Sequence, residues 1–301
     1  MKKILCTGSA GFIFSNFAYY LKDRTEYNVI HVDQNAGNFV KHVGDIADPI
    51  FVDRIFAEEK PDYVIHGAAE SFVDTSIVSA TKFVHSNVMG TQVIVDSCIK
   101  HNVNRLIYIS TDEVYGHLTD RTDRSFEEIC GMNPRNPYSA TKAAGEMIVR
   151  AAANTHGLKY NITRSCNNYG PNQPIRNLVP IVIYNILNNK EVPVYGTGEQ
   201  IREWIYVQDN CSAILHILNN APENETYNIS TPYEITNLEM VFYICDIIGR
   251  GKELVKFVKD RPGHDFRYSI SSQKLRDLGW EPVITFHDGL EKTVRWYQDR
   301  I

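Results

Sequence analysis

The stretch TGSAGFIFSN, residues 7–16, joins a short apolar segment to a helical pattern and decides the fold. Gly8 and Gly11 suit a tight turn that brings the backbone close to a pyrophosphate, and the following helix would offer its unpaired N–H groups to the phosphates. A third glycine, which serves helix–strand packing, is expected at position 14, where the chain has Phe14. The turn therefore predicts a dinucleotide site that keeps its phosphate contacts and changes its helix packing.

Strand and helix patterns alternate from this turn to about residue 165. The predicted strands are 3–7, 28–33, 62–68, 105–110 and 160–165. The predicted helices between them are 11–23, 49–59, 82–101 and 138–156. Such alternation is typical of βαβ units in a parallel sheet that is covered on both faces. We therefore expect an α/β fold with a Rossmann-type doubly wound parallel sheet.

The pattern becomes less regular after residue 170, where Tyr-Gly-Pro-Asn predicts a turn. The later predicted elements are helices at 177–188, 208–219, 236–248 and 286–299 and a strand at 226–230. We expect a dinucleotide-binding domain over residues 1–170, with segments of about 204–231 returning to its sheet. The remainder of 171–301 is expected to form a smaller mixed α/β substrate-binding lobe.

Composition excludes several classes of protein. The chain has 301 residues, of which 43% are hydrophobic and 22% charged, with a net charge of -5, so nothing in its charge favours nucleic acid or an anionic membrane as a partner. No apolar run reaches the about 18 residues of a membrane helix, and Gly8 interrupts the N-terminal run too early for a signal peptide. The six scattered cysteines lack metal-binding spacing, so we expect no metal, reduced thiols and a cytoplasmic location.

Asp33 ends the second predicted strand, about 20 residues after the glycine-rich turn. An acidic side chain at this place accepts hydrogen bonds from the ribose hydroxyls of a dinucleotide. It favours NAD over NADP, which carries a phosphate there. We therefore expect NAD as the cofactor.

Tyr138 and Lys142 are four residues apart, so they share one face of the predicted helix 138–156. A lysine charge beside a tyrosine lowers the pKa of the phenol and makes it a plausible base near neutral pH. The same spacing also fits an ordinary surface pair.

Asp112 and Glu113 are adjacent carboxylates just past the predicted strand 105–110. Ligands of a doubly wound sheet bind beyond the carboxyl ends of its strands, and two carboxyl groups in one pocket can have their pKa values driven apart. One would then serve as an acid and the other as a base. Alone, the pair also fits a helix cap.

The chain resembles the extended short-chain dehydrogenases/reductases and, among them, the nucleotide-sugar 4,6-dehydratases. The resemblance extends from residue 3 to about residue 297. The segments that carry it are TGSAGF (7–12), AAESFVD (68–74), STDEVYG (110–116), NPYSATKAAGE (136–146), SCNNYGP (165–171), GTGEQIREWIYVQD (196–209), ETYNIS (225–230) and DRPGHDFRY (260–268).

The resemblance implies a reaction on dTDP-glucose or UDP-glucose. Tyr138, helped by Lys142 and Thr111, would take the proton of the sugar C4 hydroxyl while hydride passes from C4 to NAD. Glu113 would then remove the C5 proton, and Asp112 would protonate the departing C6 hydroxyl. Hydride return to C6 would give a 4-keto-6-deoxy sugar with no net redox change.

The same resemblance implies binding residues and an assembly. Arg202 and Arg261 would pair with the phosphates, and the helices at 82–101 and 138–156 would form a four-helix bundle in a homodimer. The implied cofactor-binding residues are Gly8, Gly11, Phe12, Ile13, Asp33, Asp45, Ile46, Ala68, Ala69, Asn87, Tyr138 and Lys142. The implied substrate-binding residues are Ser71, Thr111, Asn167, Asn168, Arg202, Asn228, Arg261, His264 and Tyr297.

Three departures from the family pattern leave the catalytic residues intact. Phe14 replaces a glycine, Phe72 replaces the histidine of AAESHVD, and PNQPIRNLVP (171–180) replaces the usual PYHFPEKLIP. We expect working chemistry, with the choice between dTDP and UDP left open.

One alternative is a UDP-sugar epimerase or decarboxylase, although an epimerase would not need the pair Asp112–Glu113. The other is a non-catalytic protein that binds NAD or a sugar nucleotide, which only Phe14 supports.

Overall fold

The computed structural model describes residues 1–260 and 264–301 and has a seven-stranded parallel sheet at its centre. The strand order is β10-β6-β5-β4-β1-β2-β3, so the expected Rossmann-type α/β fold is confirmed. The strands are β1 (Lys2–Thr7), β2 (Tyr27–Asp33), β3 (His42–Val43), β4 (Tyr63–His66), β5 (Arg105–Thr111), β6 (Tyr160–Ser165) and β10 (Glu225–Ile229). The chain builds the sheet outward from β1 to one side and then from β4 to the other, so the switch point lies between β1 and β4.

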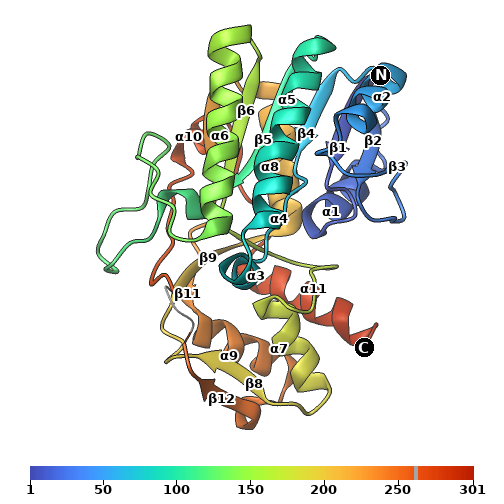
Figure 1. Cartoon of the computed structure of the whole chain (residues 1–301). Coiled ribbons are helices and arrows are strands. Elements are labelled where there is room, and N and C mark those ends of the chain that lie inside the picture. The colour runs from blue at the N-terminus through green and yellow to red at the C-terminus, as the bar shows by residue number, and fades with distance from the viewer. Residues whose placement is uncertain (261–263) are drawn as a thin grey trace.

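Helices cover both faces of this sheet (Figure 1). On one face α1 (Phe12–Leu21) packs beside α8 (Val207–Asn220). The other face carries α2 (Pro49–Glu59), α5 (Thr91–Lys100) and α6 (Pro137–His156). Alternate residues of the central strands enter the two cores, since Ile4 packs under α1 and α8 whereas Leu5 packs under α2 and α5. The short helices α3 (Val73–Val78) and α4 (Thr81–Phe83) and a π-helical turn, Val84–Gly90, lead into α5.

The start of α6 is fixed by its own sequence. The side chain of Asn136 accepts a hydrogen bond from the backbone N–H of Ser139 at 2.8 Å, the Ser139 hydroxyl accepts one from the backbone N–H of Asn136, and Pro137 occupies the first helical position. The helix ends at Gly157, whose φ of +72° suits a glycine cap. This capping places Tyr138 in the first turn, next to the carboxyl ends of the strands.

A second lobe lies beyond the carboxyl ends of the sheet strands (Figure 1). Its helices α7, α9 and α11 share one apolar core with β7, β8 and β9. The helices and strands outside the large sheet are β7 (Asn167–Tyr169), α7 (Leu178–Leu187), β8 (Val192–Tyr195), β9 (Ile201–Tyr206), β11 (Glu234–Thr236), α9 (Asn237–Ile248), β12 (Val255–Val258), α10 (Gln273–Asp277) and α11 (Phe286–Gln298). Single 3-10 turns span Asp112–Tyr115 and Lys252–Leu254.

The predicted elements are present, each with ends within two residues of its predicted bounds. The strand β10 and the helix α8 do return to the large sheet, as expected for segments of 204–231. The domain boundary near residue 170 stays a prediction. Within the described ranges, no helix is both long and apolar enough to cross a membrane.

Candidate active site

A cleft of about 1640 Å³ opens at the carboxyl ends of β1, β4 and β5 and continues into the second lobe. Its walls are the glycine-rich turn, the loop after β4, the first turns of α6, and residues of β9 and α7. Pockets for drug-sized molecules have volumes of about 300–1,000 Å³, so this cleft has room for two such ligands end to end.

The glycine-rich turn is shaped for a phosphate. Gly8 has a φ of +81°, and a Cβ atom there would lie 2.8 Å from the backbone of Ala68. The N–H of Gly11 donates to the carbonyl of Gly8 at 3.0 Å and closes the turn. Gly11 caps α1 without a side chain, so the first N–H groups of this helix remain open to an anion. Phe14 packs beneath the turn against Gly67 and leaves these features in place.

Asp33 lies where β2 reaches the cleft. One carboxylate oxygen accepts the N–H of Ala10 at 2.9 Å and the other accepts the N–H of Asn35 at 2.8 Å. These bonds fix the carboxylate and leave further lone pairs for ribose hydroxyls. The turn, the open start of α1 and Asp33 together fit the diphosphate and ribose of NAD.

Thr111 is the last residue of β5, and Thr111, Asp112 and Glu113 all line the cleft. The Thr111 hydroxyl donates to Asp112 Oδ1 at 3.1 Å, and the amide of Asn136 donates to Glu113 Oε2 at 2.9 Å. Burial, with a smaller effect from the charge of Glu113, raises the pKa of Asp112 to about 7. The two neighbouring carboxyl groups thus have different surroundings, and Asp112 can carry a proton at neutral pH.

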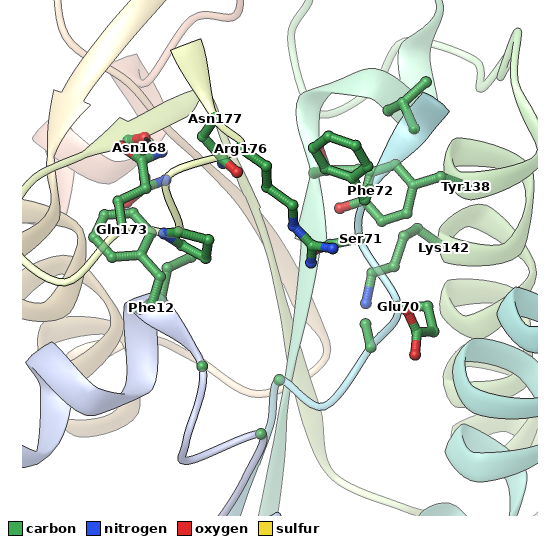
Figure 2. Close-up of a pocket in the computed structure, with 18 of the residues that line it drawn as sticks. Phe12, Glu70, Ser71, Phe72, Tyr138, Lys142, Asn168, Gln173, Arg176 and Asn177 are labelled. Atoms are coloured by element: carbon green, nitrogen blue, oxygen red, sulfur yellow. Dashed lines mark hydrogen bonds between the residues drawn. The ribbon is translucent and has the colours of Figure 1, made fainter. Parts of the chain in front are cut away.

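Tyr138 and Lys142 face the same part of the cleft (Figure 2). The expected lowering of the phenol pKa is not found: burial and then the charge of Glu113 raise the pKa of Tyr138, and a hydrogen bond with Thr111 opposes this only in part. Burial also lowers the pKa of Lys142 to about 7, so its amine is only partly charged at neutral pH. The Lys142 ammonium lies 4.2 Å from the ring centre of Tyr108.

Most of the predicted binding residues line the cleft. The cofactor-binding predictions that do so are Gly8, Gly11, Phe12, Ile13, Asp33, Asp45, Ile46, Ala68, Ala69, Tyr138 and Lys142. The substrate-binding predictions that do so are Ser71, Thr111, Asn167, Asn168, Arg202 and His264. Arg261 lies outside the described residues. These placements bring the residues together, and their individual roles stay predictions.

Three predicted residues are buried away from the cleft lining. The amide of Asn87 exchanges hydrogen bonds of 2.8 and 2.9 Å with the backbone of Glu70, so it holds the loop after β4. Asn228 accepts the hydroxyl of Tyr115 at 2.8 Å on β10, at the edge of the sheet. Tyr297 donates to the carbonyl of Gln173, which itself lines the cleft. Their polar groups serve the backbone or a neighbouring side chain, and their roles in ligand binding stay predictions.

Residues at and near the cleft escaped prediction. Tyr268 and Arg176 line it. Glu203 on β9 lies outside this lining, is buried near Asp112, accepts the Ser269 hydroxyl at 2.6 Å, and has its pKa raised by burial to about 8. Glu203 and Tyr268 stand inside the segments IREWIYVQD and DRPGHDFRY, so their place in these segments was the available signal. In the described part of the chain, no group of three or more His, Cys, Asp or Glu side chains is placed to hold a metal ion.

A family model described as the NAD dependent epimerase/dehydratase family matches residues 4–230, which carry the dinucleotide turn, the predicted catalytic residues and β10. The chain belongs to this family. The resemblance read from the sequence motifs is therefore confirmed. Because the family includes both epimerases and dehydratases, membership alone does not choose between these two activities.

Relatives that match this chain over nearly their full length include dTDP-glucose 4,6-dehydratases. The low-salt glycan biosynthesis protein Agl12 of Haloferax volcanii is 42% identical over 98% of this chain and 98% of its own. The dTDP-glucose 4,6-dehydratase of Neisseria meningitidis serogroup B is 40% identical over 99% of this chain and 94% of its own. The crystal structure of DesIV, a dTDP-glucose 4,6-dehydratase from Streptomyces venezuelae with NAD and TDP bound, superimposes with a TM-score of 0.93 at 37% identity, covering 99% of this chain and 97% of DesIV.

Proposed function

We propose that the chain is an NAD-dependent dTDP-glucose 4,6-dehydratase, a hydro-lyase that forms the 4-keto-6-deoxy sugar with loss of water. The observation that carries the proposal is the meeting of five side chains in one cleft beside the glycine-rich turn: Thr111, Asp112, Glu113, Tyr138 and Lys142. The full-length similarity to dTDP-glucose 4,6-dehydratases supports the same activity.

Tyr138 acts on the C4 hydroxyl of the sugar. Its phenol takes the hydroxyl proton, and its hydrogen bond with Thr111 holds it in place for this transfer. Gly8, Gly11 and Asp33 would hold the cofactor. When bound, NAD accepts the hydride from C4 and later returns it to C6, and its oxidised ring carries a positive charge that lowers the pKa of a nearby phenol.

Glu113 and Asp112 divide the elimination of water between them. The C4 ketone acidifies the C5 proton, which Glu113 removes with the carboxylate that Asn136 orients. The C6–oxygen bond breaks, and Asp112 donates its proton so that the hydroxyl leaves as water, which leaves a double bond between C5 and C6. When hydride returns to C6, Glu113 gives its proton back to C5. A pKa of about 7 for Asp112 suits this acid role, because half of the groups hold a proton at neutral pH. An epimerase has no step for this acid–base pair, so the pair favours the dehydratase.

The direct test is incubation of the purified protein with dTDP-glucose and, separately, with UDP-glucose. Mass spectrometry should show the loss of one water from the dTDP sugar. Water loss from the UDP sugar alone would make the chain a UDP-glucose dehydratase. A product of unchanged mass with inverted C4 would contradict the dehydratase and identify an epimerase.

We propose that the chain forms a homodimer through the segment from α4 to α5 and through α6, which pack side by side (Figure 1). Three apolar side chains on these helices are exposed: Val84 is 50%, Met89 54% and Met147 45% exposed. Exposed apolar residues gathered on adjacent helices are typical of an interaction surface.

We also propose a cytoplasmic location and a binding role for each of the two parts of the chain. The six cysteines are free thiols, which suits a cytoplasmic enzyme in a deoxysugar pathway such as that to rhamnose. Residues 1–170, with returning segments of about 204–231, would bind NAD, and the remainder of 171–301 would bind the nucleotide sugar.

A further inference from the structure

Arg176 reaches across the cleft and stacks on Phe72. Its guanidinium carbon lies 4.5 Å from the centre of the Phe72 ring. Figure 2 shows the Arg176 side chain extending from the segment before α7 toward Phe72 and Ser71. Arg176 and Phe72 both line the cleft, so this contact joins the segment before α7 to the loop after β4.

The donors of Arg176 are not used by the described residues of the protein. Among residues 1–260 and 264–301, none forms a hydrogen bond or ion pair with its guanidinium. Stacking occupies the flat face of the group and leaves its five N–H donors in the plane. A guanidinium fixed in this way is suited to bind an anion through paired hydrogen bonds.

Arg202, the phosphate-binding arginine implied by the sequence, has a different environment. Its guanidinium donates to the backbone carbonyls of Ile201 at 2.7 Å, Phe266 at 3.3 Å and Asp265 at 3.0 Å. It is buried and stacked on Tyr268 at 4.2 Å. Arg202 therefore commits several donors to the backbone, whereas Arg176 keeps its donors for a ligand.

The backbone next to Arg176 adds to the positive potential. Asn177 is the N-cap of the ten-residue helix α7, and its side chain makes no capping hydrogen bond. The first N–H groups of a helix carry a partial positive charge and suit a phosphate. Asn177 and Leu178 line the cleft, so this helix end faces the same cleft as Arg176.

We propose that Arg176, stacked on the ring of Phe72, binds the diphosphate of the nucleotide-sugar substrate. The proposal rests on the function proposed above. Both residues stand where the chain departs from the family pattern: Phe72 replaces a histidine, and Arg176 replaces the glutamate of PYHFPEKLIP. The change from glutamate to Arg176 reverses the charge in the segment before α7. The change from histidine to Phe72 provides an aromatic surface for this cation in the loop after β4. Phe72 restricts the arginine side chain before the ligand arrives, which reduces the entropy lost on binding.

The test is isothermal titration of the NAD-loaded protein with thymidine diphosphate, uridine diphosphate and thymidine. Arg176→Ala should weaken binding of the preferred diphosphate by about 10- to 100-fold and change thymidine binding by less than about twofold. Arg176→Lys should recover only part of the loss, because an ammonium lacks the planar fork.

Phe72→Ala tests the contribution of the ring on which Arg176 stacks. This variant should weaken diphosphate binding by about 3- to 10-fold. Combining it with Arg176→Ala should weaken binding no further than Arg176→Ala alone, because the ring acts through the arginine. Arg300→Ala is the matched control: its guanidinium also stacks on a ring, that of Trp296 at 4.3 Å, outside the cleft lining. This variant should bind the diphosphate as the wild type does.

The results separate this proposal from the proposed function. Unchanged diphosphate affinity in Arg176→Ala, in a protein that converts dTDP-glucose, overturns the role of Arg176 and leaves the dehydratase standing. Equal losses for thymidine and its diphosphate also overturn it, because the contact would then not be with phosphate. A wild-type protein that binds neither diphosphate and converts neither sugar overturns both.

Discussion

The ring of Phe14 lies against the backbone of Gly67, between the first turn of α1 and the end of β4. A Cβ atom at Gly67 would fall 1.9 Å from Phe14 Cε2. The ring is only 3% exposed and meets Phe17 edge-on, with 5.8 Å between the ring centres. The third glycine of such a turn usually stands at the position of Phe14 and lets the helix pack closely on the strand. Here Gly67, just after β4, leaves the room instead, so Phe14 fits without changing Gly8 or Gly11.

Gly67→Ala should therefore destabilise the protein by about 1–3 kcal/mol, because its methyl group would overlap the Phe14 ring. Phe14→Ala should cost about 3–5 kcal/mol through the cavity it leaves. In the Phe14→Ala background, Gly67→Ala should cost almost nothing, since the colliding ring is gone. Urea unfolding of the four proteins measures this coupling.

Gly131→Ala is the control for this cycle. A Cβ atom at Gly131 meets nothing within 4 Å, so the change in the free energy of unfolding should stay below about 0.5 kcal/mol. An equal cost of Gly67→Ala with and without the Phe14 ring would contradict the packing relation.

Glu113→Gln should separate the two halves of the reaction. Hydride removal from C4 depends on Tyr138, so absorbance of the reduced cofactor should appear and persist. Removal of the C5 proton needs the carboxylate, so formation of the dehydrated product should fall by about 10²–10⁴-fold. Stopped-flow absorbance and mass spectrometry of the product measure the two steps.

Tyr138→Phe is the companion variant, and it should show neither the absorbance nor the loss of water. The assignment of Glu113 as the base is wrong if Glu113→Gln turns over at the wild-type rate.

Asp112→Asn should stabilise the protein above pH 7. Burial, and secondarily the charge of Glu113, raises the pKa of Asp112 from 3.8 to about 7, so the folded protein holds this proton more tightly than the unfolded chain. Stability is then lost as the pH rises through this interval, by at most about 4 kcal/mol for three pKa units. The uncharged amide avoids that loss, and the gain should be about 2–4 kcal/mol at pH 8 and less than half of that at pH 5.

Urea unfolding at both pH values measures this gain. The control is Asp23→Asn, an exposed position, which should change stability by less than about 0.5 kcal/mol at either pH. Equal gains for Asp112→Asn at pH 5 and pH 8 would show that packing, and not ionisation, is responsible.

The fold was largely predictable because strand and helix periods repeat along the chain. Each predicted strand pairs in the central sheet, and the residues at strand ends, such as Thr111 and Asp33, enter one cleft as the doubly wound topology requires. The strands β3, β7, β8, β9, β11 and β12 were not predicted. All of these except β9 have only two to four residues, and each pairs with a strand elsewhere in the chain.

The side-chain environments were less predictable, because burial and long-range contacts decide them. Asn87 and Asn228 have the residue types of ligand contacts, yet their amides are used by the protein itself. The pKa of Tyr138 rises because burial and the charge of Glu113 outweigh the hydrogen bond with Thr111. The contact of Phe72 with Arg176 joins residues about a hundred positions apart, and no local pattern reports it.

Met147→Glu should dissociate the proposed homodimer. Met147 lies on the exposed side of α6, and a two-fold axis would bring this side of both copies together. Each dimer would then bury two carboxylates in an apolar contact, which should weaken association by about 30- to 1,000-fold. Sedimentation velocity over a range of concentrations measures the effect. Ile129→Glu is the control, because Ile129 is apolar and 90% exposed but lies outside both helices, so the dimer should persist. A monomeric wild type, or a Met147→Glu dimer of unchanged affinity, would place the interface elsewhere or remove it.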